Sequence, residues 1–399
     1  MIGVKAKIDI WSVVVIGLLW FSAAASLLDD SINAVALYVA LPAAAVLCAL
    51  RWGLRTNVYF KLLMAIYAWS LLTCVFSCDV TVSMATMKQM LGGALVSFIV
   101  IKASGHNKNL LWVYAAYIVF YIFMWKYANE NLLNIIDVES TRMNDEKLNA
   151  NHMGYHTFFI TFIIYIFGEI LDGKLKKVFR LLLFAIIPLS IFTALVTASR
   201  QILIIQIPLL ALLLYHRYLW GKLSARRIVV VLLVVVVATY LLRDYVVSLF
   251  DGSLLAVRSE TELTDDNRIY LLWRAFYVGL HNPVFGVGPG CFIYFSGTMH
   301  FSHCTYTELM ACSGLIPAFL YIAIIYKFVK MQVARYKETK LPLFLAFTVF
   351  GIIFALDNFF YVFHTDIWLI SFLMLVCAHG ELYFMELENK DAEKIEAVK

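Results

Sequence analysis

The chain has 399 residues and a formal net charge of +5, yet only 15% of its residues are charged and 62% are hydrophobic. A soluble domain has about a quarter of charged residues, so this composition excludes one and indicates an integral membrane protein. Lys and Arg are spread over short connections without forming a basic face, which argues against a nucleic-acid partner.

Apolar runs of about twenty residues recur along the chain, and each is long enough to cross a bilayer core as a helix, whereas a barrel would show short alternating segments. They predict an all-α integral membrane protein with about 12 transmembrane helices. The first run follows Lys5 and Lys7. It is too long for a signal-peptide core and lacks a cleavage site, so we expect it to be retained as a span. The predicted spans are residues 9–28, 33–50, 57–77, 86–103, 109–127, 154–171, 178–198, 201–220, 226–242, 303–326, 341–360 and 366–386.

Positive charge separates the predicted connections into two sets. Most of the 32 Lys and Arg residues fall near the termini and in alternate connections. The positive-inside rule then places both termini and these connections in the cytoplasm. The basic connections are residues 51–61, 102–108, 174–180, 217–227 and 327–340.

The remaining connections are predicted to lie on the outer side of the membrane. The longest are residues 128–153 and 243–302, and the second is expected to contain amphipathic helices before the tenth span. No repeat or linker divides the chain. Residues 1–385 are therefore predicted to form one membrane domain, followed by a charged cytoplasmic tail at 386–399.

The seven cysteines show neither a Cys-x-x-Cys pair nor metal-finger spacing. Most lie within or beside apolar runs, where a small buried side chain is the simplest interpretation. A disulfide between Cys291 and Cys304 in the exported loop stays open, although the spacing gives it no support.

The polar stretch from Arg243 to Ile316 interrupts the apolar sequence, so water-exposed chemistry is expected there. Its segment DDNRIYLLWRAFYVGLHNP has apolar side chains at helical spacing. This predicts an amphipathic helix that lies on the membrane, with Arg268 in its first turn. Arg268 is a candidate for binding phosphate, with a salt bridge to a nearby acid as the structural alternative. Arg274 is a weaker substrate-binding candidate, for which a plain surface charge is the simpler interpretation.

Two further candidates come from the ends of predicted spans. Arg200 ends a span on the outer side, where positive charge is sparse. We favour phosphate binding for it over an interfacial Arg that only contacts lipid phosphates. Asp357 lies near the outer end of another span, where a carboxylate is costly and normally has a partner or a task. Arg200, Arg268 and His303 are its candidate partners.

A turn-rich segment and a histidine follow the amphipathic helix. Residues 282–290 have no preceding strand and no Walker lysine, so they are not a nucleotide loop. They either bring backbone close to a substrate or return the chain to the membrane. His303 heads the next span, followed by Glu308, which is a substrate-binding candidate. Histidine accepts protons near neutral pH, so His303 is the candidate base, with a structural histidine as the alternative. No carboxylate cluster accompanies His300 and His303, so no metal site is predicted.

The earlier outer loop, residues 128–153, is rich in hydrogen-bonding side chains. An ordinary solvated loop is the alternative to a sugar-binding role. The candidates for recognising sugar hydroxyls are Arg142, Asn144, Asn151 and His152.

Three segments together resemble the O-antigen polymerase and ligase superfamily of polytopic bacterial glycosyltransferases. They are TASRQILI at 197–204, RIYLLWRAFYVGLHNPVFGVGPGCF at 268–292 and HCTYTELMACSGL at 303–315. Their order matches the family pattern of an Arg at a span end, an R…W…NP..G.G…F segment and an H….E…..G segment. The similarity covers about the last half of the chain, and Cys304 and Pro317 depart from the residues usual in the family.

The resemblance implies transfer of a glycan from a polyprenyl diphosphate to a hydroxyl acceptor at the periplasmic face of the bacterial inner membrane, with inversion and without a metal or cofactor. Arg200 and Arg268 would hold the diphosphate, His303 would engage or deprotonate the acceptor, and Asp357 matches a late-span acidic residue of ligases. The expected partners are the lipid-linked glycan, a glycan or lipid A core acceptor, membrane lipids and, as a further candidate, a chain-length regulator protein.

A polymerase of O-antigen or capsular repeat units is the preferred hypothesis, because the segment from His303 to Glu308 and the polar loop at 128–153 resemble polymerases slightly more. A ligase that moves finished glycan onto lipid A core stays open. A transporter or flippase of a lipid-linked sugar is the alternative from another class. Transporters place polar groups at the membrane midplane and use inverted repeats, whereas the candidates here gather at one face.

Overall fold

The computed structural model describes residues 9–105, 109–131, 150–197, 207–218, 267–362, 364 and 366–398. Every regular element in this part of the chain is a helix, and no strand occurs in it. Seven of the described helices are long and apolar enough to cross a membrane. The described residues therefore confirm the predicted all-α membrane protein, while the total of about 12 spans stays a prediction.

In chain order the helices are α1 (Ile10–Ala25), α2 (Asp30–Val35), η1 (Ala36–Ala40), α3 (Leu41–Trp52), α4 (Val58–Thr73), η2 (Cys74–Phe76), α5 (Val80–Ser104), α6 (Leu110–Asn131), α7 (Ala150–Ile170), α8 (Gly173–Thr197), α9 (Ile207–Tyr218), α12 (Asn267–His281), η6 (Cys291–Phe295), α13 (Thr305–Ser313), α14 (Leu315–Thr339), α15 (Pro342–Asp357) and α16 (Ile367–Val398). The helices long enough to span are α5, α6, α7, α14, α16, the joined α2–η1–α3 and the joined α4–η2. α1 and α15 are shorter apolar helices.

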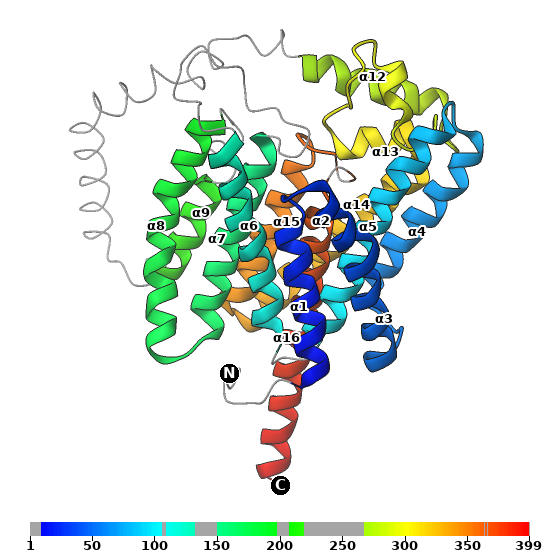
Figure 1. The fold of residues 1–399 in the computed structure, drawn as a ribbon. Helices are drawn as coiled ribbons and strands as arrows, with labels where there is room; N and C mark the ends of the chain where they lie inside the picture. Colours follow the sequence, from blue (N-terminus) through cyan, green and yellow to red (C-terminus); the bar gives the residue numbers. More distant parts are fainter. Residues whose placement is uncertain are drawn as a thin grey trace, which may run out of the picture.

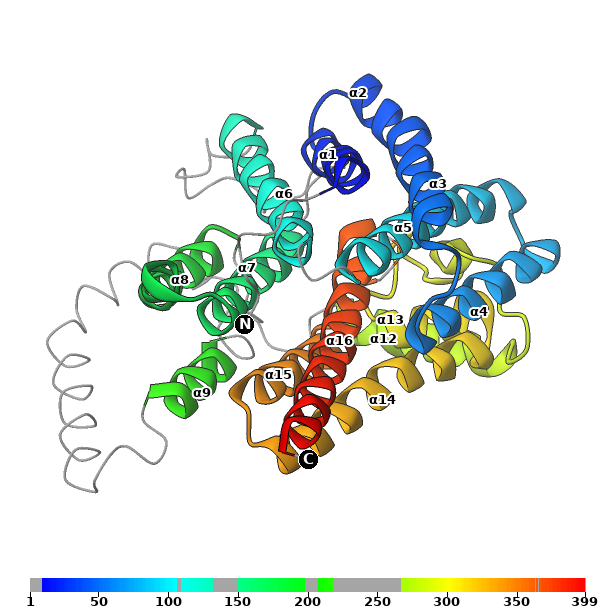
Figure 2. The same cartoon turned by 90° about the horizontal axis from the view of Figure 1, so that it is seen from below.

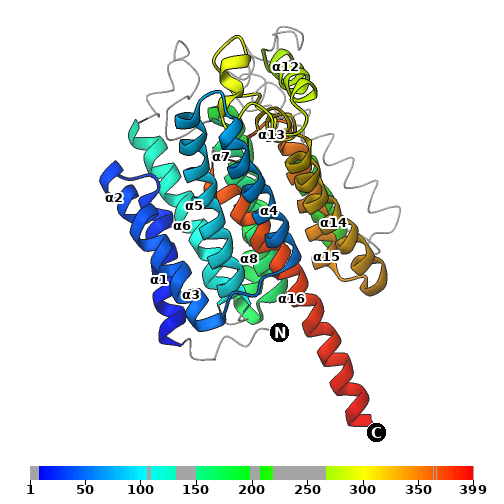
Figure 3. The ribbon, with the colours of Figure 1, turned by 90° about the vertical axis from the view of Figure 1, so that its right-hand side faces the viewer.

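The two ends of the helix bundle differ in charge. One end, here called the basic end, contains three helix connections: α3 to α4 (residues 52–58), α7 to α8 (170–173) and α14 to α15 (339–342). The C-terminal part of α16 projects from the same end (Figure 1). α12 and α13 lie at the opposite end, here called the distal end (residues 77–79, 267–314, 358–362, 364 and 366; Figure 3). This asymmetry is what the positive-inside rule expects if the basic end faces the cytoplasm, and the orientation stays a prediction. The Lys and Arg residues in the helix ends and connections of the basic end include Arg51, Arg55, Lys102, Lys174, Lys176, Lys177, Arg180, Lys337 and Lys340.

α16 lies inside the bundle, in contact with α4, α5, α7, α14 and α15 (Figure 2). Two glycines of α5 allow the close approach of their neighbours. A Cβ at Gly92 would lie 3.1 Å from Leu37 Cδ1, and one at Gly93 would lie 3.1 Å from Ile370 Cγ2 of α16. Small residues at helix contacts let membrane helices gain van der Waals packing, because lipid supplies no hydrophobic drive for helix association.

The predicted span at 303–326 is not one helix. The chain forms the short α13, breaks at Gly314 and restarts as α14, which continues to Thr339. Gly314 has a φ of +88°, and a Cβ there would lie 2.2 Å from the Val284 carbonyl oxygen. The left-handed backbone and this close approach end α13, and the Leu315 N–H donates to the Pro283 carbonyl at 2.8 Å.

The last of the predictions about the fold concern one further span and the C-terminal tail. The predicted span at 226–242 lies outside the described residues. The predicted tail at 386–399 continues α16 as a helix as far as Val398, so this part of the chain adopts the helical form.

Candidate functional site

The distal end carries a folded unit formed by α12, residues 282–290, η6 and α13, here called the distal unit. α12 begins at Asn267 and has Arg268 in its first turn, as its helical spacing predicts. Its inner face is buried through Leu271, Ala275 and Val278. Its outer face is apolar but exposed, with Trp273 at 63% exposure. An exposed aromatic and aliphatic face on a short helix at the end of a membrane bundle is typical of an interfacial helix. The outer-face residues are Ile269, Tyr270, Trp273, Phe276, Tyr277 and Leu280.

The turn-rich segment at 282–290 attaches α12 to α13 and to the α4–α5 connection. The Val287 and Gly288 N–H groups donate to the Ala311 and Cys312 carbonyls, both at 2.9 Å. The Val287 carbonyl accepts from the Cys78 N–H at 3.1 Å. These backbone groups are therefore engaged by the protein itself, which supports a structural role for the turn.

His303 lies on a tight turn that a buried carboxylate holds in shape. The residue has a φ of +56°, an uncommon conformation for a side chain with a Cβ, and it is half-buried. The preceding Ser302 N–H donates to Glu308 Oε2 at 2.8 Å, and the Cys312 thiol donates to Glu308 Oε1 at 3.4 Å. Glu308 is 1% exposed. Glu308 therefore shapes the turn that presents His303.

The same turn meets the end of α15. The Thr305 N–H donates to the Asn358 carbonyl at 2.8 Å, and the Thr305 hydroxyl donates to the Tyr361 carbonyl at 2.6 Å. Asp357 is buried next to these contacts, and its carbonyl accepts from the Tyr155 hydroxyl at 3.2 Å. The structure thus brings the segments of three predicted site residues together: His303, Glu308 and Asp357.

The predicted cations have different surroundings. Arg268 is half-exposed in the first turn of α12. Arg274 donates through Nε to the Phe295 carbonyl at 2.8 Å, and its guanidinium lies 5.7 Å from the centre of the Tyr277 ring. The hydrogen bond to Phe295 ties α12 to η6.

Four predicted residues lie beyond what the structure describes at the side-chain level. Arg200, Arg142 and Asn144 are outside the described residues. Asn151 is in the first turn of α7, where only its backbone is described.

The sequence analysis did not identify a cluster of buried ionisable side chains beside this site. His156 of α7 donates through Nε2 to Asp366 Oδ2 at 2.7 Å, and their side chains are only 1% and 6% exposed. His364 is also buried, and burial lowers its pKa to about 4, so it is neutral at physiological pH. His364 lines a small cavity together with Glu308. A histidine inside a predicted span was the available signal for His156, because ionisable side chains within a membrane normally have a partner or a task.

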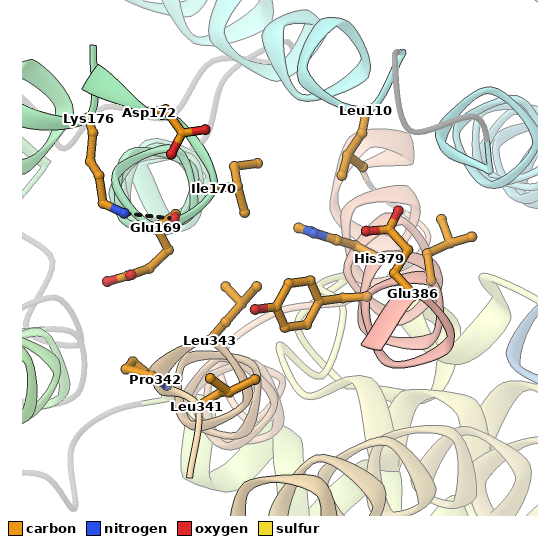
Figure 4. A pocket seen from close by; sticks show the side chains of 12 residues that line it. Leu110, Glu169, Ile170, Asp172, Lys176, Leu341, Pro342, Leu343, His379 and Glu386 are labelled. Atoms are coloured by element: carbon orange, nitrogen blue, oxygen red, sulfur yellow. Dashed lines mark hydrogen bonds between the residues drawn. The ribbon is translucent and has the colours of Figure 1, made fainter. Parts of the chain in front are cut away.

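A separate cavity of about 220 Å³ lies at the basic end (Figure 4). Its polar walls come from Glu169, Asp172, Lys176 and Glu386, and the buried His379 points toward it. The Lys176 ammonium donates to the Glu169 carbonyl at 3.4 Å. This cavity is at the opposite end from His303, so it is not part of the candidate site.

The fold and the distal cluster define a class: an all-α polytopic membrane protein with ionisable side chains buried near one end of its bundle. No protein-family model matches the chain, and no curated protein matches it. The function therefore rests on the chemistry of the site and on the resemblance of its segments.

Proposed function

We propose that the protein is a membrane glycosyltransferase that transfers a glycan from a polyprenyl diphosphate to a sugar hydroxyl, acting as a polymerase of O-antigen or capsular repeat units. The observation that carries the proposal is the distal unit. An amphipathic helix with Arg268 in its first turn precedes a turn that presents His303, at the end of a membrane bundle. A substrate that is half lipid and half sugar needs such a junction between membrane and water.

The donor would bind along α12. Its exposed apolar face would lie among lipid tails, so the polyprenyl chain stays in the membrane while the diphosphate reaches the polar rim. Arg268 would bind the diphosphate at this rim, because guanidinium grips phosphate oxygens bidentately and keeps its charge. Arg200 is proposed as the second guanidinium. Their fixed charge would stabilise the negative charge that develops on the leaving diphosphate.

The acceptor would bind beside His303. The acceptor oxygen attacks the anomeric carbon, the bond from that carbon to the diphosphate oxygen breaks, and the lipid diphosphate leaves. The hydroxyl proton passes to the His303 imidazole and then to water. Attack opposite the leaving group inverts the anomeric centre. Glu308 would act by holding the turn, since both of its oxygens bond to neighbouring residues of the same segment.

The proposal is tested by chain growth in nanodiscs with a synthetic polyprenyl-diphosphate repeat unit. We expect His303→Ala to lower kcat by about 10²–10⁴ and Arg268→Ala to lower kcat/KM by about 10²–10³. His300→Ala, on an exposed residue three positions away, is the matched control and should retain activity. Turnover is expected to persist in a chelator. Full activity in both His303→Ala and Arg268→Ala would contradict the proposed site.

The ligase alternative differs only in the acceptor. Asp357, buried at the end of α15, matches the late-span acidic residue of ligases. Parallel reactions with a second lipid-linked repeat unit and with a lipid A core acceptor distinguish the two. Product on the core acceptor alone would replace polymerase with ligase.

A transporter of lipid-linked sugar is the second candidate, and one observation favours it. The His156–Asp366 pair is buried within the bundle, and transporters use buried ionisable groups in their ion and substrate paths. Vesicles that contain the protein and a lipid-linked sugar test it. Movement of the sugar between leaflets without glycan growth would favour transport over transfer.

A further inference from the structure

Cys78 and Cys291 meet at the distal end although they are far apart in sequence. The Cys291 sulfur lies 3.2 Å from the Ser77 hydroxyl oxygen and 3.4 Å from the Asp79 carbonyl oxygen. These atoms belong to the two residues that flank Cys78. The Cys291 thiol therefore lies next to Cys78. A disulfide requires a Cβ separation of about 4 Å, which only segments in direct contact, such as these two, can supply.

The backbone around both residues is held in this position. The Cys78 N–H donates to the Val287 carbonyl, and the Cys291 N–H donates to the Gly288 carbonyl at 3.0 Å. A Cβ at Gly288 would lie 2.1 Å from the Ser77 Oγ, so the loop approaches the α4–α5 connection as closely as a glycine allows. Backbone contacts therefore hold the two segments against each other and keep Cys291 beside the α4–α5 connection.

We propose that Cys78 and Cys291 form a disulfide that links the α4–α5 connection to the distal unit when the distal end faces an oxidising compartment. The pairing differs from the Cys291–Cys304 bridge that the sequence left open. Cys304 is instead the residue just before α13, where its N–H donates to the Ser302 hydroxyl oxygen at 3.2 Å.

The disulfide would form by thiol–disulfide exchange with an oxidant that itself carries a disulfide. Cys78 is exposed and Cys291 is buried, so the Cys78 thiolate attacks the oxidant's disulfide and forms a mixed disulfide. The Cys291 thiolate then attacks the Cys78 sulfur, which forms the Cys78–Cys291 bond and releases the second oxidant thiolate. The protein loses two electrons and two protons, and the oxidant gains them as a dithiol.

The resting thiols react slowly without such an oxidant. Although Cys78 is exposed as a residue, partial desolvation of its thiol raises its pKa to about 11, and the neighbouring Cys291 thiol adds to the rise. Little thiolate is present near neutral pH, so a catalysed exchange is required in the cell. Once formed, the bond closes a long loop of chain, which restricts the unfolded state and fixes the distal unit against the spans.

The experiment maps the cysteines in the full-length protein. Cells are lysed in N-ethylmaleimide to block free thiols, and the purified protein is digested without reductant for mass spectrometry. We expect one linked peptide pair containing Cys78 and Cys291, lighter by two hydrogens than the sum of its thiol forms. Cys78→Ser and Cys291→Ser should abolish it. Cys74→Ser, which removes a buried thiol nearby, should retain it.

A second experiment tests whether the two cysteines can pair when an oxidant is supplied, independently of the compartment that the distal end faces in the cell. Reduced, purified protein is treated with oxidised glutathione, and the same linked pair is expected. If neither preparation contains it, or if Cys291 links to Cys74 or Cys304, the assigned pairing is overturned. If only the glutathione-treated protein contains it, the cellular disulfide is overturned and the distal end faces a reducing compartment.

Discussion

Removing one partner of the buried pair of His156 and Asp366 is expected to destabilise the fold strongly. The two side chains are 2.7 Å apart and almost fully buried. Asp366 also accepts the Trp368 N–H at 2.8 Å, so the carboxylate joins α7 to the start of α16. His156→Phe keeps a ring between Phe120 and Phe159, its neighbours at 4.6 and 5.2 Å, but removes the partner of the carboxylate.

The cost follows from leaving one charged group buried alone. Breaking a buried pair by removing one partner costs about 3–5 kcal/mol, whereas removing both can be nearly neutral. We therefore expect His156→Phe to lower the free energy of unfolding by about 3–5 kcal/mol. The double variant with Asp366→Ala should recover at least about 2 kcal/mol relative to the sum of the two single variants.

The assay is equilibrium unfolding in mixed micelles with increasing SDS, followed by circular dichroism. The exposed pair of Arg51 and Asp9, 3.9 Å apart and about half exposed, is the control. Arg51→Ala should cost less than about 1 kcal/mol. A cost below about 1 kcal/mol for His156→Phe, or strict additivity in the double variant, would refute the reasoning.

Three further outcomes are expected. Gly288→Ala should lower the free energy of unfolding by about 1–3 kcal/mol or more in the same assay, because Gly288 has a φ of +107° and a Cβ there would collide with Ser77. Gly17→Ala is the control and should be neutral or stabilising, because Gly17 has open space around it. His364, whose pKa burial lowers to about 4, binds its proton more readily when unfolded, so stability should fall by about 3 kcal/mol between pH 6.5 and 4. His364→Phe should remove that part of the pH dependence, and an unchanged profile would contradict it. A spin label at Trp273→Cys should be more accessible to oxygen than to a water-soluble nickel reagent in nanodiscs, and the reverse would place the outer face of α12 in water.

The sequence predicted those features that depend on local pattern. The apolar runs predict helices, and the described spans confirm them. The spacing of Leu272, Trp273 and Phe276 predicts α12, which begins beside Arg268 as expected. Such signals are periodic in sequence, so they are visible without knowing which segments meet in space.

The missed features depend on contacts between distant segments. His156 and Asp366 are 210 positions apart, and a histidine inside a predicted span does not by itself reveal which distant residue is its partner. Cys78 and Cys291 likewise meet only once the turn at 282–290 packs on the α4–α5 connection. The break at Gly314 was missed for another reason. Hydropathy is averaged over a window, and one glycine in an apolar run leaves the average almost unchanged.

The buried polar groups of α6 bear on the choice between transfer and transport. Tyr114 bonds to His379 at 3.0 Å, and Tyr117 bonds to Ser371 at 2.8 Å, so both tyrosines join α6 to α16. The Phe372 ring packs edge-on against both tyrosines. A substrate path needs polar groups that exchange partners, whereas these two tyrosines are paired and packed against an apolar ring. They are better suited to fixing the helix register of a rigid scaffold, which favours a site confined to the distal end.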